Sequence, residues 1–340
     1  MQTAVCVGET MVVLSPEPGL PLEKADVLNV GIGGAESNVA VGFAAMGLDS
    51  HWVSRVGRDG FGARILTELG ERGVNVSAVE TDDAHPTGAY VKVPRTEDAP
   101  ASVLYYRRGS AASAMEPRML DRPDVAELLD RASLIHLSGI TAALSEDCLA
   151  LLQALLARPR NGARVSFDVN WRPSLWVGRD PSILRELANQ ADIVLVGRDE
   201  AELALGTGDD DELRALLPDP DVVVIKNEST SAIALVKGGQ RWEVPSLTVD
   251  VVEPVGAGDS FAAGYLSGVL LGLDQKASLR RGHVAAACTL VVSGDHGPLP
   301  PAPVLERILA CSDDEWTLTS ASRAGFAIAG QSLGVEAARP

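Results

Sequence analysis

Short, nearly continuous apolar runs recur along the chain and alternate with segments of helical periodicity. Such runs are typical of strands in a parallel sheet that is covered on both faces. The expected strands span residues 4–7, 52–56, 134–137, 164–168, 193–196, 222–225 and 233–236. The expected helices between them span residues 61–72, 146–156, 182–188, 200–205 and 211–216. This alternation predicts an α/β fold, a doubly wound α/β/α sandwich.

Three shorter segments break this rhythm because apolar and polar residues alternate in them. They span residues 11–14, 89–93 and 103–106. We expect a small antiparallel sheet inserted at an edge of the main sheet, with strands from about residues 11–30 and 87–108. Residues 312–340 are rich in Ala, Ser and Gly and show little periodicity. We interpret them as a C-terminal extension, a candidate for disorder, after a single domain that spans residues 1–311.

The composition narrows the class of protein. A net charge of −17 argues against binding to nucleic acid or to anionic membranes, because phosphate contacts need clustered Lys and Arg. No apolar run is long enough to span a bilayer and the N-terminus has no signal-peptide pattern, so we expect a cytoplasmic protein. The four cysteines lack Cys-x-x-Cys spacing, so we expect buried thiols and neither a metal site nor disulfides. They are Cys6, Cys148, Cys288 and Cys311.

The strongest candidate chemistry lies in the run Gly256-Ala257-Gly258-Asp259, which leads into a stretch of small and apolar residues. Glycine removes the Cβ atoms that would keep an anion away from the backbone, and a following helix would supply free N–H groups. Asp259 would accept a proton from a hydroxyl beside that anion hole, as phosphoryl transfer to an alcohol requires. The helix N-terminus should lower the pKa of Asp259 and make it a weak base. The alternative is a tight turn with Asp259 as helix cap.

A second glycine turn occurs at residues 31–38, where the sequence reads GIGGAESN and leads into another helix of small residues. Gly34 would let a polar ligand approach the backbone, and Asn38 can both donate to and accept from hydroxyl groups. The alternative is a polar cap at Asn38, with glycines that serve close helix packing.

Together, the two glycine motifs resemble the signatures of the ribokinase-like (PfkB) carbohydrate kinases, and the resemblance covers roughly residues 3–311. It implies a ribokinase-like fold in which the small inserted sheet is a lid that excludes water. It also implies ATP and Mg²⁺ as cofactors, with Asp259 as the base and the backbone of residues 256–258 as the anion hole.

Within that family, the runs at residues 104–113 and 168–176 are most similar to 2-keto-3-deoxygluconate kinases. The resemblance assigns the binding of the sugar acid to Gly34, Tyr90, Tyr105, Arg107, Arg172 and Asp295. Two arginines on one cleft suit an acceptor with a carboxylate, because the guanidinium presents a planar fork of donors. Structural roles for the two arginines, and lid packing for the two tyrosines, remain open alternatives.

The segments that the resemblance assigns to nucleotide binding depart from the family pattern. The resemblance assigns nucleotide binding to Asn170, Lys226 and Ser229 together with Gly256 and Gly258, but the Lys-x-Gly-x-x-Gly run of many relatives reads KNESTS here. Only the Glu of the family's Asn-x-x-Glu is kept, at position 200, and the first Asp of the C-terminal signature is Glu253. Glu200 would act in the outer shell of Mg²⁺, with a helix-start acid as an equally good interpretation.

Other functions stay open at this point. The chain could be a related kinase for fructose or ribose, a nucleoside kinase, or a weakly catalytic sensor of sugar acids. Retention of the GAGD run argues against the sensor, and the arginines argue against the nucleoside kinase. The inserted sheet has an apolar face and an unpaired edge, so we also expect a homodimer through the lid, or a higher assembly built from it.

Overall fold

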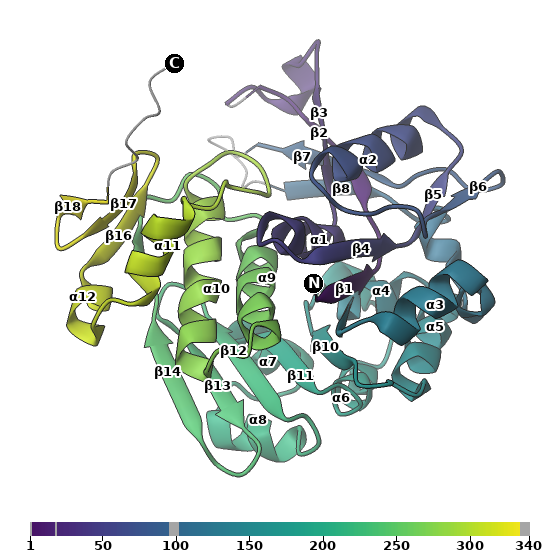
Figure 1. The fold of residues 1–340 in the computed structure, drawn as a ribbon. Coiled ribbons are helices and arrows are strands. Elements are labelled where there is room, and N and C mark those ends of the chain that lie inside the picture. Colours follow the sequence, from purple (N-terminus) through teal and green to yellow (C-terminus); the bar gives the residue numbers. More distant parts are fainter. Residues whose placement is uncertain (1, 18, 95–101, 334–340) are drawn as a thin grey trace.

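The computed structural model describes residues 2–17, 19–94 and 102–333, and its centre is an eight-stranded sheet (Figure 1). The strand order is β14-β13-β12-β11-β10-β9-β1-β4. The strands are β1 (Thr3–Val7), β4 (Asp49–Val53), β9 (Leu134–Ser138), β10 (Arg164–Asp168), β11 (Ile193–Gly197), β12 (Val222–Asn227), β13 (Ser231–Val236) and β14 (Arg241–Pro245). All neighbours from β12 to β4 are parallel, as predicted. Strands β13 and β14 are antiparallel to their neighbours, because the turns before them are too short for a crossover.

Helices cover both faces of this sheet, and each face has its own apolar core. One face packs against α1 (Ala35–Ala45), α2 (Gly60–Glu71), α9 (Ala257–Leu270), α10 (Gln275–Leu290), α11 (Ala302–Leu309) and α12 (Asp313–Thr317). The other packs against α3 (Pro123–Arg131), α4 (Gly139–Leu144), α5 (Glu146–Ala157), α6 (Ser182–Ala188), α7 (Arg198–Ala204) and α8 (Asp210–Leu216). Short 3-10 helices occur at Leu22–Lys24, Ala112–Ala114, Pro117–Asp121 and Pro173–Leu175. The predicted α/β/α sandwich is confirmed.

The sequence predicts one strand at residues 52–56, but the structure has two separate strands there. Strand β4 ends at Val53, and β5 (Arg55–Gly57) turns away to pair with β6 (Glu80–Asp82) in a small sheet of its own. Ser54 separates the two strands and is fully buried, so its neighbours read as one continuous apolar run in the sequence.

The inserted sheet contains β2 (Met11–Ser15), β3 (Asn29–Gly33), β7 (Ala89–Val93) and β8 (Ser102–Tyr106), in the order β3-β2-β7-β8. It projects from the edge of the sandwich near β4 and α1 (Figure 1). The prediction of an antiparallel sheet is wrong for one pair, because β2 and β7 run parallel. These strands lie far apart in the sequence, which leaves room for the crossover connection that a parallel pair requires. Residues 95–101 of the predicted lid lie outside the described residues.

The expected disorder of the C-terminal segment is wrong for residues 312–333, which form regular elements. Residues 312–333 form α12 and the strands β16 (Thr319–Ser322), β17 (Gly325–Ile328) and β18 (Gln331–Ser332), which join β15 (Thr248–Val249) in a four-stranded sheet. Trp316 anchors this segment: its indole Nε1 donates to the Pro245 carbonyl at 2.8 Å, and the Arg280 guanidinium lies 4.7 Å from its ring centroid. Residues 334–340 lie outside the described residues, and the domain boundary at residue 311 stays a prediction.

All four cysteines are buried free thiols, as predicted. Among the described residues, none of the helices combines the length and the apolar character that crossing a membrane requires.

Candidate active site

A cavity of about 350 Å³ opens between the lid and the carboxyl ends of the parallel strands. This edge of a doubly wound sheet is where ligands usually bind. The predicted site residues that line it are Gly34, Asn38, Tyr90, Tyr105, Arg107, Asn170, Arg172, Glu200, Lys226, Gly256, Gly258, Asp259 and Asp295. Ser229 is exposed and lies outside this wall, and Ala257 lies between the two glycines of the turn.

The glycine turn before α9 forms one end of the cavity. Gly256 caps the helix with a φ of 80°, a left-handed conformation, and a Cβ there would lie 2.6 Å from the Asp295 carbonyl oxygen. A Cβ on Gly258 would meet only the Lys226 ammonium, at 3.7 Å. The first N–H groups of a helix lack partners within the helix, so this turn presents donors and a cation to the same space.

Asp259 lies in the first turn of α9 and is oriented by Asn38. The Asn38 amide Nδ2 donates to Asp259 Oδ2 at 2.8 Å, which brings the two glycine motifs together. Burial raises the pKa of Asp259 to about 7, and the hydrogen bond from Asn38 opposes this only in part. The expected lowering of this pKa is therefore wrong, because the cost of desolvating the carboxylate exceeds the benefit of the helix N-terminus.

The same amide group reaches a second carboxylate. Asn38 Nδ2 lies 3.4 Å from Asp295 Oδ2. Lys92, which the sequence interpretation missed, lies on the other side of Asp295, with its Nζ 3.7 Å from Oδ1 and in contact with Glu253. The sequence could have indicated this position. Lys92 follows Tyr90 by two residues on one strand, so the two side chains lie on the same face of the sheet.

Arg107 forms part of the cavity wall and is held by a buried acid that was also missed. The Arg107 Nε donates to Glu9 Oε2 at 2.7 Å, and Ser110 Oγ donates to Glu9 Oε1 at 2.8 Å. The guanidinium lies 5.6 Å from the ring centroid of Tyr105, which in turn lies 5.7 Å from that of Tyr90. The two predicted tyrosines and Arg107 are thus brought together as one lid surface.

Arg172 enters the cavity from the opposite side and is more exposed than Arg107, with side-chain exposures of 46% and 10%. Its Nη1 lies 3.2 Å from Glu200 Oε1. Glu200 Oε2 accepts from the Gly197 N–H at 2.9 Å, so this carboxylate also caps α7. The described residues contain no cluster of three acidic, His or Cys side chains that could hold a metal ion. The outer-shell role of Glu200 stays a prediction.

Lys226 and Asn170 lie where β12 and β10 end. The Lys226 Nζ donates to Asp168 at 2.8 Å and 3.1 Å. Burial alone would lower the pKa of Lys226, but Asp168 and Glu200 raise it, so the ammonium is charged. Asn170 has a φ of 40°, and its buried side-chain oxygen has no hydrogen-bond partner among the described residues. Buried polar atoms are nearly always paired, so this oxygen suits a contact with a bound ligand.

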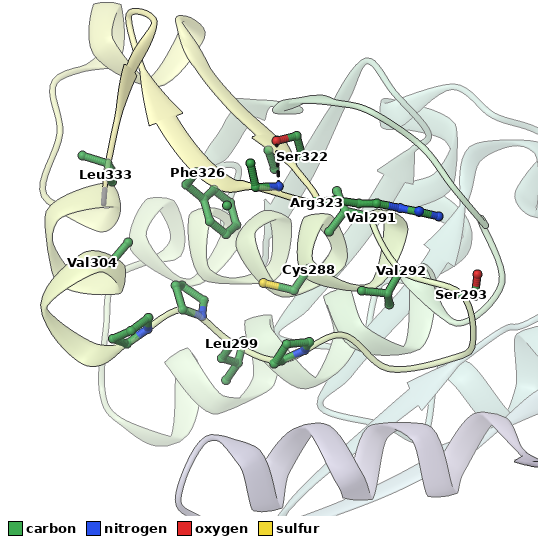
Figure 2. A pocket seen from close by; sticks show the side chains of 16 residues that line it. Cys288, Val291, Val292, Ser293, Leu299, Val304, Ser322, Arg323, Phe326 and Leu333 are labelled. Carbon is green, nitrogen blue, oxygen red and sulfur yellow. Dashed lines mark hydrogen bonds between the residues drawn. The ribbon is translucent and has the colours of Figure 1, made fainter. Parts of the chain in front are cut away.

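A second hollow, of about 520 Å³, lies between α10, α11 and the C-terminal strands (Figure 2). Its wall contains Cys288, Leu299, Val304 and Phe326, and Arg323 is its one charged side chain among the described residues. Among the described residues, its wall has no carboxylate beside a glycine turn, unlike the cavity at Asp259.

Comparison with known proteins identifies the family of this chain and several relatives. The sequence pattern of the pfkB family carbohydrate kinases matches residues 1–302. The chain is 35% identical over 319 residues to the 2-dehydro-3-deoxygluconokinase of Bacillus subtilis, covering 90% of this chain and 95% of the relative. It is 31% identical to the 2-dehydro-3-deoxygalactonokinase of Haloferax volcanii, with coverages of 91% and 97%. The crystal structure of the 2-dehydro-3-deoxygluconokinase of Thermotoga maritima superposes with a TM-score of 0.79 at 26% identity, covering 91% and 98%.

Proposed function

This chain belongs to the pfkB family of carbohydrate kinases, and we propose that it transfers the γ-phosphoryl group of ATP to the 6-hydroxyl of 2-keto-3-deoxygluconate. The kinase activity toward a sugar hydroxyl follows from the family and its 2-dehydro-3-deoxygluconokinase relatives. The choice of substrate and the residue roles are our proposal. The observation that carries it is Asp259, held by Asn38 beside a glycine turn, in a cavity closed by Tyr90, Tyr105 and Arg107.

In this proposal Asp259 is the general base. The substrate oxygen forms a bond to the γ-phosphorus, the bond from that phosphorus to the oxygen of the leaving ADP breaks, and the hydroxyl proton passes to the Asp259 carboxylate. A pKa near 7 suits this task, because a base works best when its pKa lies close to the working pH. Backbone N–H groups of residues 256–258 and the Lys226 ammonium would stabilise the charge on the transferring group.

The cations of the cavity support an anionic acceptor. Arg107, Arg172, Lys92 and Lys226 all line it. Glu9 takes part of the Arg107 fork, but a guanidinium has five N–H donors, so Arg107 retains donors for a substrate carboxylate. Gly34, Tyr90, Tyr105 and Asp295 would complete the contacts with the sugar acid.

The nucleotide would lie toward Lys226, Asn170 and the Gly256–Gly258 turn, with Ser229 outside the cavity wall as a weaker candidate. Mg²⁺, when bound with the nucleotide, would offset the negative charge of the phosphate groups. The residues fit this form of binding, since Mg²⁺ commonly uses one or two carboxylates together with phosphates and water. Glu200 would support that water shell while it remains paired with Arg172.

The decisive experiment is an ADP-release assay with sugar acids, neutral sugars and nucleosides as acceptors. We expect the highest kcat/KM with 2-keto-3-deoxygluconate, and the galactonate epimer belongs in the screen because one relative bears its name. Fructose or ribose as the best acceptor would overturn the sugar-acid proposal. Binding of the acid without ADP release would favour the sensor.

A further inference from the structure

Lys92 is a lid residue that touches two carboxylates on the body of the protein. It lies on β7 and points toward the cavity, like Tyr90. Its ammonium contacts Glu253 and lies 3.7 Å from Asp295 Oδ1. Glu253 Oε2 also accepts from the Gly294 N–H at 3.0 Å. A single cation therefore joins the lid to the segments on both sides of the glycine turn.

Asp295 connects Lys92 to the candidate base through one amide group. Asn38 Nδ2 lies 2.8 Å from Asp259 and 3.4 Å from Asp295. The shorter contact is the stronger hydrogen bond, so Asn38 is committed mainly to Asp259. Lys92 approaches Asp295 from the far side, at the oxygen that Asn38 does not contact.

We propose that Lys92 is a positioning residue for phosphoryl transfer: its ammonium holds Asp295 in place as a charged carboxylate and thereby leaves the Asn38 amide to orient Asp259. This inference rests on the proposed function of the same cavity. Lys92 need not touch the reacting atoms, so its effect passes through Asp295 and Asn38.

The surroundings of Asp295 make this support necessary. Burial raises the pKa of Asp295, whereas Lys92 and then Asn38 lower it. The other charged groups that affect it are Glu253, which raises its pKa, and Arg72, which lowers it. The buried hydroxyl of Tyr90 also lies close by. Loss of Lys92 removes the nearer cation, and Asp295 should then take up a proton at a higher pH.

A proton on Asp295 would change the hydrogen bonds around Asn38. A proton on Asp295 Oδ2 would place an O–H donor against the Asn38 Nδ2 donor. The amide would then rotate to present its oxygen to Asp295, which withdraws Nδ2 from Asp259. The charged groups that act on Asp259 itself are Asp168, Lys226 and Arg172, none of which is on the lid. Among the described residues Lys92 contacts Asp295 and not Asp259, so its effect on Asp259 passes through Asp295 and Asn38.

The test compares Lys92→Met with Lys92→Arg and with a matched control, Arg108→Met, which removes one exposed positive charge from the same lid. Activity on the best acceptor is measured from pH 5.5 to 9. For Lys92→Met we expect kcat to fall about tenfold near pH 6.5 and the acid limb of the profile to move up by about one pH unit, since one pKa unit corresponds to a tenfold change in protonation. Lys92→Arg should restore most of the activity, and Arg108→Met should leave the profile unchanged.

A second measurement needs no substrate. Carbon-13 NMR of labelled aspartate carboxyl groups, with Asp295→Asn to assign the signal, follows the titration of Asp295 directly. We expect Lys92→Met to move that titration to higher pH and Lys92→Arg to leave it near the wild-type position. An unchanged titration and acid limb in Lys92→Met, with only a lower melting temperature, would overturn the proposal. If the wild-type enzyme phosphorylates no sugar acid, the proposed function fails, and the titration still decides whether Lys92 controls the charge of Asp295.

Discussion

The amide nitrogen of Asn38 lies 2.8 Å from a carboxylate oxygen of Asp259, although 221 positions separate the two residues. Each residue lies in the first turns of a helix that follows a glycine turn. The two helices, α1 and α9, pack against the same face of the sheet. This packing brings two separate sequence motifs together, and the hydrogen bond from Asn38 orients the carboxylate of the candidate base.

The first prediction concerns the chemistry. Asp259→Asn keeps the volume of the side chain and removes the base, so turnover should fall by at least ~10²-fold. Binding of ATP, measured by calorimetry, should survive, because the glycine turn and Lys226 are unchanged. Turnover close to that of the wild type would remove Asp259 from the mechanism.

The same substitution should stabilise the protein at alkaline pH. Asp259 has a folded pKa of about 7, above its ordinary value near 4, so the folded state binds more protons than the unfolded state. Its contribution to stability is fully present below about pH 4 and is lost as the pH rises through 7. At pH 8, Asp259→Asn should therefore raise the free energy of unfolding by about 1–2 kcal/mol. This expected gain is smaller than the pKa shift alone would give, because solvent in the cavity screens the charge. Thermal unfolding should show little gain at pH 4, and an equal gain at both pH values would contradict this explanation.

The sandwich was predictable because its buried strands are continuous apolar runs. The two glycine motifs were predictable because Gly256 has a left-handed conformation and a Cβ on Gly34 would clash with the Glu9 carbonyl oxygen. The pairing of Arg107 with Glu9 was not, since 98 positions separate them and Glu9 reads as an ordinary acid after the first strand. The pKa of Asp259 was misjudged because a sequence displays the helix start but not the depth of burial. Strands β16–β18 were missed because they are short and consist largely of Ser, Thr, Ala and Gly, although Ser312 and Glu315 form a readable capping box.

The two glycines of the turn should respond differently to alanine. Gly256→Ala places a Cβ in a left-handed conformation and 2.6 Å from the Asp295 carbonyl oxygen, so it should lower the free energy of unfolding by more than ~1 kcal/mol. Gly258→Ala meets no backbone atom, so the fold should tolerate it while KM for ATP rises. Denaturant unfolding and steady-state kinetics of both variants check this. Equal stability of the two variants would show that the turn can relax.

Substitution of Arg107 or Arg172 should change KM for sugar acids but not for neutral sugars. Alanine at Arg107 or Arg172 should raise KM for the acid by about tenfold or more, because a charge-assisted hydrogen bond contributes ~1.5–3 kcal/mol. KM for ribose or fructose should hardly change. Removal of Arg107 also leaves Glu9 buried without its cation, so Arg107→Ala with Glu9→Gln is the proper control. Equal losses for acid and neutral sugars would assign both arginines a structural role.

The last prediction is self-association through the lid. Strand β8 is exposed along its whole length, and Val103, Leu104 and Tyr106 present apolar surface on it. An edge of this kind is usually paired, covered or charged in soluble proteins, so we expect a homodimer built on the lid, or a larger assembly that contains it. Val103→Lys is the better test, because Val91 is buried and a lysine there would disturb the lid itself. Val103→Lys should weaken assembly in light scattering and raise KM for the sugar acid together, since pairing of two lids would stiffen the strands that carry Tyr90, Tyr105 and Arg107. Val103 also lines the cavity, so Leu104→Lys, at an exposed position outside the cavity wall, is the control that should show the same two effects. A fully active wild-type monomer at assay concentration would end this idea.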